Sequence, residues 1–215
     1  MKIAYINPNS TEAMTESVVA VARRANPEAE IIGWTNHDGP PAIQGPEDGA
    51  AAVPGLLALL PRAKVEGVDA IVIACFDDTG LAEIRAAAHC PVIGIGQAAY
   101  VTASLLGHRF SVVTTLDVSV PVIEGNIETL GYGENCASVR ASGLPVLTVE
   151  EGSEDTRAHL AREIIAVQGE GATAAVLGCA GMADLRDDLA ARTGLPLIDG
   201  VAASAQLAQA LARLA

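Results

Sequence analysis

The sequence contains the same unit twice: a strand-like segment, a cysteine, a turn and a helical pattern, in that order. This repeat limits the possible folds more than any other feature. Cys75 follows an apolar, β-branched segment at 68–74, and Cys179 follows a similar segment at 172–178. In both copies a small, turn-prone stretch comes next and leads into a helical pattern. A unit repeated in this way indicates two structurally similar parts.

The repeat continues beyond the two cysteines. Pro91 lies 16 residues after the first cysteine and Pro196 lies 17 residues after the second, and each proline opens an apolar strand followed by an alanine-rich helix. The segment 5–9, at the end of the first strand, corresponds to the segment 110–115. The two copies together therefore account for most of the chain.

Strand-like and helix-like segments alternate throughout, which is typical of βαβ units with parallel sheets. We expect strands near 2–7, 29–34, 69–75, 91–95, 109–114, 137–140, 173–178 and 195–198. We expect helices near 11–25, 47–66, 80–89, 97–107, 118–131, 153–169, 182–193 and 201–214. The pattern predicts an α/β fold of two similar parallel-sheet halves, related by pseudo-twofold symmetry, with the active site in the cleft between them.

The repeat also places the boundary between the halves. We assign residues 1–96 to the first half and 97–204 to the second, with the C-terminal helix at about 205–215 packing back on the first half. Parallel sheets bind ligands beyond the carboxyl ends of their strands. The loops after residues 6, 75, 113 and 178 lie at such ends, so they converge if the halves face one another.

Composition excludes several classes of partner. The 26 acidic and 13 basic residues give a net charge of −13, which disfavours nucleic acid and anionic membranes. No apolar segment approaches the ~20 residues that span a bilayer, and no signal peptide is recognisable, so we predict a cytoplasmic location. Glu150 and Glu151 are interpreted as a solvated charge cluster.

The four cysteines are expected to be free thiols, because disulfides are rare inside cells. No CxxC pair occurs, and the four histidines show no ligand spacing, so we predict no metal. Cys90 and Cys136 lack the repeated context and are interpreted as structural.

Two thiols at equivalent strand ends suit a racemase that uses no cofactor. One thiolate removes a proton from carbon, and the other thiol returns a proton to the opposite face. We expect Cys75 and Cys179 to lie at helix N-termini, which lower a thiol pKa. The alternative is a pair of buried core cysteines, a common environment for this residue. Their matched placement favours the catalytic interpretation.

Other polar residues near the strand ends allow two interpretations each. Asn7 and Asn9 either hold polar groups of a substrate or shape the turn before the next helix. Thr114 and Thr115 offer hydroxyls and backbone N–H groups, or are ordinary strand residues. Asp78 is interpreted as a helix cap.

Several segments match a known family. They are Ile6-Asn7-Pro8-Asn9-Ser10, Glu66-Gly67-Val68-Asp69-Ala70, Ile73-Ala74-Cys75-Phe76-Asp77-Asp78, Pro91-Val92-Ile93-Gly94-Ile95, Arg109-Phe110-Ser111-Val112-Val113-Thr114-Thr115, Val176-Leu177-Gly178-Cys179-Ala180-Gly181-Met182 and Ile198-Asp199-Gly200-Val201. Through them the chain resembles the hydantoin racemases of the aspartate/glutamate racemase superfamily over essentially its full length.

The resemblance implies a pyridoxal-independent mechanism in which Cys75 and Cys179 exchange roles between enantiomers. It implies a small-molecule substrate, a 5-substituted hydantoin or allantoin, and assembly into a homo-oligomer. The residues that it implies for holding the substrate ring are Asn7, Asn9, Ile43, Phe76, Asp77, Thr114, Thr115, Ala180 and Gly181.

Two departures from the family pattern bear on substrate choice. Segment 42–48 lacks an aromatic residue, and Thr79 stands where many members have proline. With only 3% aromatic residues, the chain favours small or polar C5 substituents, and Phe76 is the main ring available.

Two alternative functions remain open. The first is an aspartate/glutamate-type racemase, which needs a cationic clamp, whereas Arg109 lies at a strand start, away from the proposed loops. The second is ureide binding without catalysis. Arylmalonate decarboxylases need only one such cysteine, so the pair counts against that activity.

Overall fold

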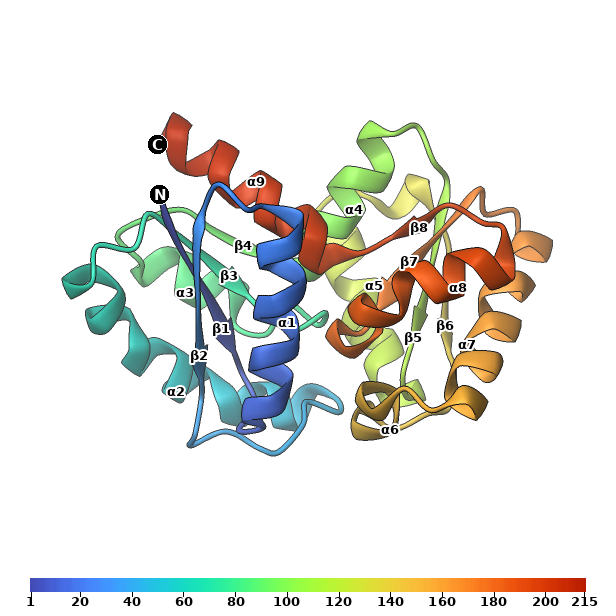
Figure 1. Cartoon of the computed structure of the whole chain (residues 1–215), viewed down its shortest axis with the longest axis horizontal. Helices are drawn as coiled ribbons and strands as arrows, with labels where there is room; N and C mark the ends of the chain where they lie inside the picture. Colours follow the sequence, from blue (N-terminus) through green and yellow to red (C-terminus); the bar gives the residue numbers. More distant parts are fainter.

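Two four-stranded parallel sheets form the framework of the structure, a computed structural model that describes residues 1–215. The first sheet has the order β2-β1-β3-β4, with β1 at Lys2–Asn7, β2 at Glu30–Thr35, β3 at Ala70–Ile73 and β4 at Val92–Gly94. The second has the order β6-β5-β7-β8, with β5 at Phe110–Thr114, β6 at Cys136–Ala141, β7 at Ala174–Gly178 and β8 at Leu197–Ile198. The equivalent strand orders confirm the predicted α/β fold of two similar halves, which lie side by side in Figure 1.

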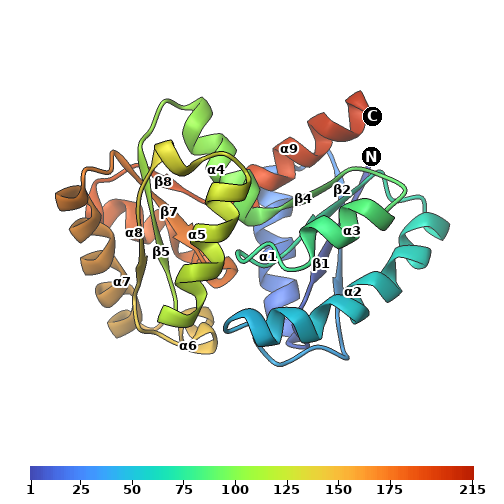
Figure 2. The ribbon, with the colours of Figure 1, turned by 180° about the vertical axis from the view of Figure 1, so that it is seen from behind.

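Helices flank both sheets (Figure 2). In the first half they are α1 (Glu12–Ala25), α2 (Pro46–Val65), α3 (Leu81–Ala87) and α4 (Ile95–Leu105). In the second they are α5 (Val120–Thr129), α6 (Val146–Glu151), α7 (Glu154–Ala166), α8 (Arg186–Thr193) and α9 (Gly200–Leu214). Short 3-10 turns lie at η1 (Asp117–Ser119), η2 (Gly133–Asn135), η3 (Val167–Glu170) and η4 (Ala180–Leu185). None of the helices combines the length and apolarity needed to cross a bilayer.

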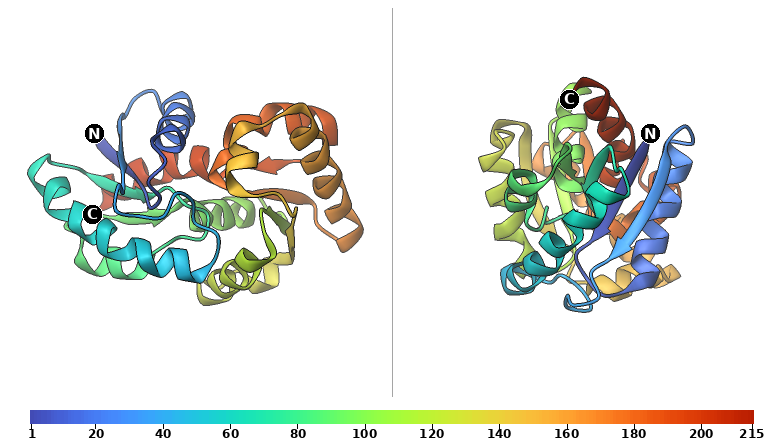
Figure 3. Two further views of the ribbon diagram at one scale, coloured as in Figure 1. Left: turned by 90° about the horizontal axis from the view of Figure 1, so that it is seen from below. Right: turned by 90° about the vertical axis from the view of Figure 1, so that its left-hand side faces the viewer.

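The central strands are buried on both faces, as expected for parallel sheets covered by helices. Every residue of β3, β5 and β7 is buried. The largest hydrophobic cluster contains Tyr5 and Val72 from the first sheet together with Val112 and Val176 from the second. This shared core fixes the two halves against each other, and Figure 3 shows them adjoining when viewed from below.

The helix that follows the last strand of each sheet packs on the opposite half. Helix α4 follows β4 but contacts β7 and β8, and α9 follows β8 but contacts β3 and α1. The Tyr5 hydroxyl is 2.8 Å from the Ser204 hydroxyl, and Asn26 Nδ2 donates to the Ala205 carbonyl at 2.9 Å. Helices α4 and α9 also pack on each other (Figure 1), so they connect the halves. The domain boundary at 96 and 97 remains a prediction.

Two of the departures from the expected secondary structure bear on the site. The strand expected at 69–75 ends at Ile73, so Cys75 lies in a turn. The sequence did not predict α6, because a helix of 6 residues after Pro145 is too short to show a helical repeat.

Candidate active site

The two thiols line one small cavity between the sheets. Cys75 lies just beyond β3, and Cys179 directly follows β7, the equivalent strand of the second half. The cavity has a volume of about 30 Å³, enough for about two water molecules. Both halves therefore contribute a thiol to the same small space.

Most of the residues predicted for the site line this cavity. They are Asn9, Ile43, Cys75, Phe76, Asp77, Thr115, Cys179 and Ala180. The cavity also includes residues that sequence reasoning missed, namely Met14, Ala74, Ser119, Val146 and Gly178. Met14 looks like an ordinary apolar helix residue in the sequence, Val146 lies outside every expected helix and strand, and no local signal marks Ser119.

Three predicted residues lie behind the lining. The Asn7 amide donates to Asn9 Oδ1 at 2.9 Å and to the Thr15 hydroxyl at 3.0 Å, so it shapes the turn. The Thr114 hydroxyl donates to the Gly178 carbonyl at 2.9 Å. Gly181 contributes its backbone next to Cys179. These contacts stabilise the loops that carry the lining residues.

Asn9 has hydrogen-bonding capacity to offer a ligand. Its Oδ1 accepts from the Thr11 backbone N–H at 3.0 Å as well as from Asn7. Its Nδ2 has only the Met14 sulfur as a partner, at 3.5 Å, and a thioether is a weak acceptor. The Asn9 side chain is thus held by its oxygen, while its amide N–H groups remain available.

The expectation that helix N-termini lower both thiol pKa values is wrong. Cys75 is separated from α3 by the turn 76–80. Burial raises the pKa of Cys75 far above its usual value, and the neighbouring Asp77 carboxylate raises it further. The larger effect, burial, depends on tertiary packing, which the local sequence does not reveal, whereas Asp77 is a neighbour in the sequence.

Cys179 does directly precede η4, but its pKa is raised as well. Burial raises its pKa to about 12, and the Gly181 backbone N–H, which stabilises the thiolate, only partly offsets this effect. The Glu150 carboxylate also raises the pKa of Cys179. The interpretation of Glu150 as solvated is wrong, because its Oε2 is buried without a hydrogen-bond partner.

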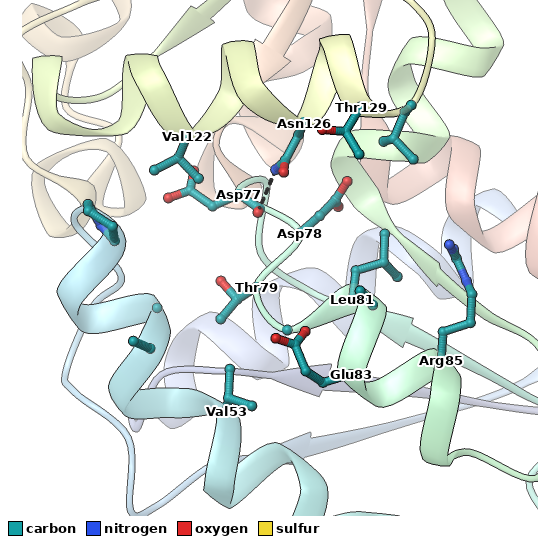
Figure 4. A pocket seen from close by; sticks show the side chains of 17 residues that line it. Val53, Asp77, Asp78, Thr79, Leu81, Glu83, Arg85, Val122, Asn126 and Thr129 are labelled. Carbon is teal, nitrogen blue, oxygen red and sulfur yellow. Dashed lines mark hydrogen bonds between the residues drawn. The ribbon is translucent and has the colours of Figure 1, made fainter.

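Asp77 is the one acidic side chain in the cavity lining. Its Oδ2 is buried without a partner, and burial raises its pKa to about 7, an effect partly offset by the Ser119 hydroxyl. Asp77 also borders a larger, open pocket of about 470 Å³ between α2, α3 and α5. There Asn126 Nδ2 donates to the Asp77 carbonyl at 2.8 Å, which fastens the turn to α5 (Figure 4).

Phe76 lines the cavity while its ring packs into the core. The ring meets Tyr100 edge-on, with centroids 5.6 Å apart. Neither here nor elsewhere in the structure do three His, Cys, Asp or Glu side chains converge in an arrangement suited to a metal ion.

Comparison with known proteins gives consistent matches. A family model described as Asp/Glu/Hydantoin racemase matches residues 3–208. A hydantoin racemase of Rhizobium meliloti is 46% identical over 213 residues, which cover 98% of this chain and 88% of that protein. An allantoin racemase structure from Klebsiella pneumoniae has a TM-score of 0.93 and 38% identity, covering 100% of this chain and 88% of that chain. The allantoin racemase from Pseudomonas fluorescens has a TM-score of 0.91 and 35% identity, covering 100% of this chain and 92% of that chain. These matches confirm the resemblance and the fold predicted from the sequence.

Proposed function

Because the chain belongs to the Asp/Glu/hydantoin racemase family and is an isomerase of the racemase type, we propose that it racemises a five-membered cyclic ureide, a 5-substituted hydantoin or allantoin. The observation that carries this proposal is that Cys75 and Cys179, from equivalent strand ends, line one cavity. Self-association and a cytoplasmic location remain predictions from the sequence.

The proposed reaction is a proton exchange at C5. The thiolate of one cysteine takes the C5 proton and becomes a thiol, and the electron pair of the C–H bond enters the enolate of the ring. The thiol of the other cysteine then gives its proton to the opposite face and becomes a thiolate. Protons and charge balance over the cycle, and the two cysteines exchange roles for the other enantiomer.

The high thiol pKa values affect the two roles differently. A protonated thiol is ready to donate, so burial favours the acid. The base is scarce at neutral pH, but a thiolate of higher pKa is a stronger base toward a weakly acidic C–H bond. Burial therefore lowers the fraction of each cysteine that is thiolate and raises the basicity of the thiolate that forms.

The cavity offers the polar partners that a ureide ring requires. Such a ring alternates C=O acceptors with N–H donors. Asn9 supplies unused amide N–H groups, and Asp77 supplies a carboxylate oxygen without a partner. No Arg or Lys lines the cavity, which favours a neutral ring over an acidic amino acid. A cavity of about 30 Å³ is smaller than the ring, so the residues that line it must shift when a ring binds.

The test is circular dichroism of (S)-allantoin and of L- and D-5-substituted hydantoins incubated with enzyme and reductant. We expect the signal to decay to zero from either enantiomer above the enzyme-free blank. Cys75→Ser and Cys179→Ser should each abolish racemisation, while each retains C5 deuterium exchange with one enantiomer.

Cys90→Ser is the matched control, because Cys90 lies outside the cavity. It should retain wild-type activity. Full activity in either catalytic-cysteine variant would contradict the two-base mechanism. Binding without C5 deuterium incorporation would instead support a ureide-binding protein.

A further inference from the structure

The second aspartate after Cys75 has a role that the lining of the cavity does not reveal. Asp78 is buried, and it is the only non-glycine residue with a positive φ, 48°. Its backbone N–H donates to the Cys75 carbonyl at 3.0 Å, which closes the turn that carries the thiol. A non-glycine residue in this region requires support from its surroundings.

The Asp78 side chain supplies that support from a distant helix. Its Oδ1 accepts from the Gly96 N–H at 2.9 Å, and its Oδ2 accepts from the Gln97 N–H at 2.7 Å. Both donors belong to the first turn of α4, where backbone N–H groups otherwise lack partners. Asp78 is therefore a helix cap, as predicted, but for α4 rather than for α3, which follows it in sequence.

Helices α4 and α9, which each pack on the opposite half, are capped in different ways. In the repeat, Gly94 before α4 corresponds to Asp199 before α9. Asp199 caps its own helix, accepting from Val201 at 2.8 Å and Ala202 at 3.2 Å. A side chain at position 94 would collide with the Asp78 carboxylate. Because Gly94 has no Cβ, the Asp78 carboxylate can occupy that space.

This difference has a consequence for Cys75. In the second half the Asp199 carboxylate accepts only from its own helix, α9, and makes no hydrogen bond to the Cys179 loop. In the first half the cap is part of the Cys75 turn, and the helix that it caps packs on β7, the strand that leads to Cys179. The Asp78 carboxylate thus connects the Cys75 turn to helix α4, which packs on the strand that leads to Cys179.

From this arrangement we propose that Asp78 is a positioning residue, which holds the Cys75 turn on α4 and thereby sets the place of the Cys75 thiol relative to Cys179. The inference rests on the proposed two-cysteine function. It distinguishes Asp78 from a plain helix cap, whose only effect would be on stability.

The second half supplies the design of the test. The exchange variant Asp78→Gly/Gly94→Asp moves the carboxylate to the N-cap, as Asp199 has it, and releases the turn. Gly94 has φ −95° and Asp199 has φ −98°, so the new aspartate fits the backbone. Glycine is suited to the positive φ at position 78. The single variant Asp78→Gly completes the set.

We expect Asp78→Gly to lower Tm by about 2–4 °C, through the lost cap, and kcat by about 100-fold, through misplacement of the thiol, with little change in KM. The exchange variant should recover Tm but not kcat. Recovery of both would show that Asp78 is only a cap and would overturn the proposal.

Alkylation by iodoacetamide, with each cysteine followed by mass spectrometry, gives a readout that needs no substrate. Cys75 should react at least about tenfold faster in both Asp78 variants, while Cys179 in the same molecule reacts as in wild type. An unchanged Cys75 rate would contradict the proposal. If the wild type racemises no ureide, the proposed function fails, yet the Cys75 rate still tests Asp78.

Asp199→Gly is the matched control, because it removes an equivalent cap without touching either cysteine turn. It should lower Tm and leave kcat and both alkylation rates unchanged, and an equal loss of kcat there would overturn the proposal. If the exchange variant does not fold, the single variant Asp78→Gly still removes both acceptor oxygens from the Gly96 and Gln97 N–H groups. Full kcat with slow Cys75 alkylation in that variant would also refute the role.

Discussion

The Thr114 hydroxyl donates a 2.9 Å hydrogen bond to the carbonyl of Gly178, the residue before Cys179. The two residues are also partners in the β5–β7 register. A Cβ at Gly178 would lie 2.9 Å from the Thr114 Cα, so only glycine allows this close approach. The pair therefore fixes the end of β7, from which Cys179 projects.

This relationship separates two threonines that look alike in the sequence. Thr114→Val keeps the shape but loses the hydrogen bond, and should lower the free energy of unfolding by about 1 kcal/mol in urea denaturation. Thr115→Val should leave stability within about 0.5 kcal/mol and raise KM, because Thr115 lines the cavity. Equal kinetic effects of the two variants would contradict this division.

Asn7 should act on stability rather than on substrate contacts. Asn7→Ala removes the partner of the buried Asn9 N–H, which donates to Asn7 Oδ1 at 3.1 Å. The free energy of unfolding should fall by about 1–3 kcal/mol, the cost of leaving buried polar groups unpaired. Asn135→Ala, in the short turn η2, is the control and should change it by less than about 0.5 kcal/mol. A stability loss no greater than that of the control would rule out this role.

Asp77→Asn should change two measured quantities in different ways. Removing the carboxylate charge lowers the pKa of Cys75, so iodoacetamide should alkylate Cys75 faster at pH 8. Cys179 should respond less, because Asp77 is the smallest of the causes that raise its pKa. If Asp77 also accepts an N–H of the ring, KM should rise by about threefold to tenfold. Unchanged Cys75 alkylation would exclude the electrostatic effect.

The dependence of kcat/KM on pH should reflect the buried thiols. Burial, with Asp77 near Cys75 and Glu150 near Cys179, keeps both pKa values above the assay range, with that of Cys179 at about 12. Below its pKa a thiol gains thiolate as the pH rises, so kcat/KM should increase by up to about tenfold per pH unit between pH 7 and 9.5. Racemisation in enzyme-free buffer is subtracted at each pH. A plateau near pH 8.5, the value for an exposed thiol, would contradict burial as the dominant effect.

Local and repeated sequence patterns were enough to predict several parts of the protein. Alternating strand and helix patterns predicted the α/β class, because a buried parallel strand is apolar throughout its length. The matched surroundings of Cys75 and Cys179 predicted that both thiols reach one cleft, since equivalent strands of two similar sheets end at equivalent places. The turn after the first strand left two interpretations open for Asn9, and Asp77 was predicted only through the resemblance to the racemase family.

How these residues interact depends on contacts that form when the chain folds. The thiol pKa values depend on burial and, for Cys179, on the Glu150 carboxylate that folding brings close, so local helix signals predicted the wrong direction. Ser119 joins the cavity from η1 without any local sequence signal. The Asp78 carboxylate caps a helix whose first turn lies 18 residues further along the chain. Such contacts join residues that are distant in sequence, and their strength depends on the exclusion of water, which exists only once the two halves have packed together.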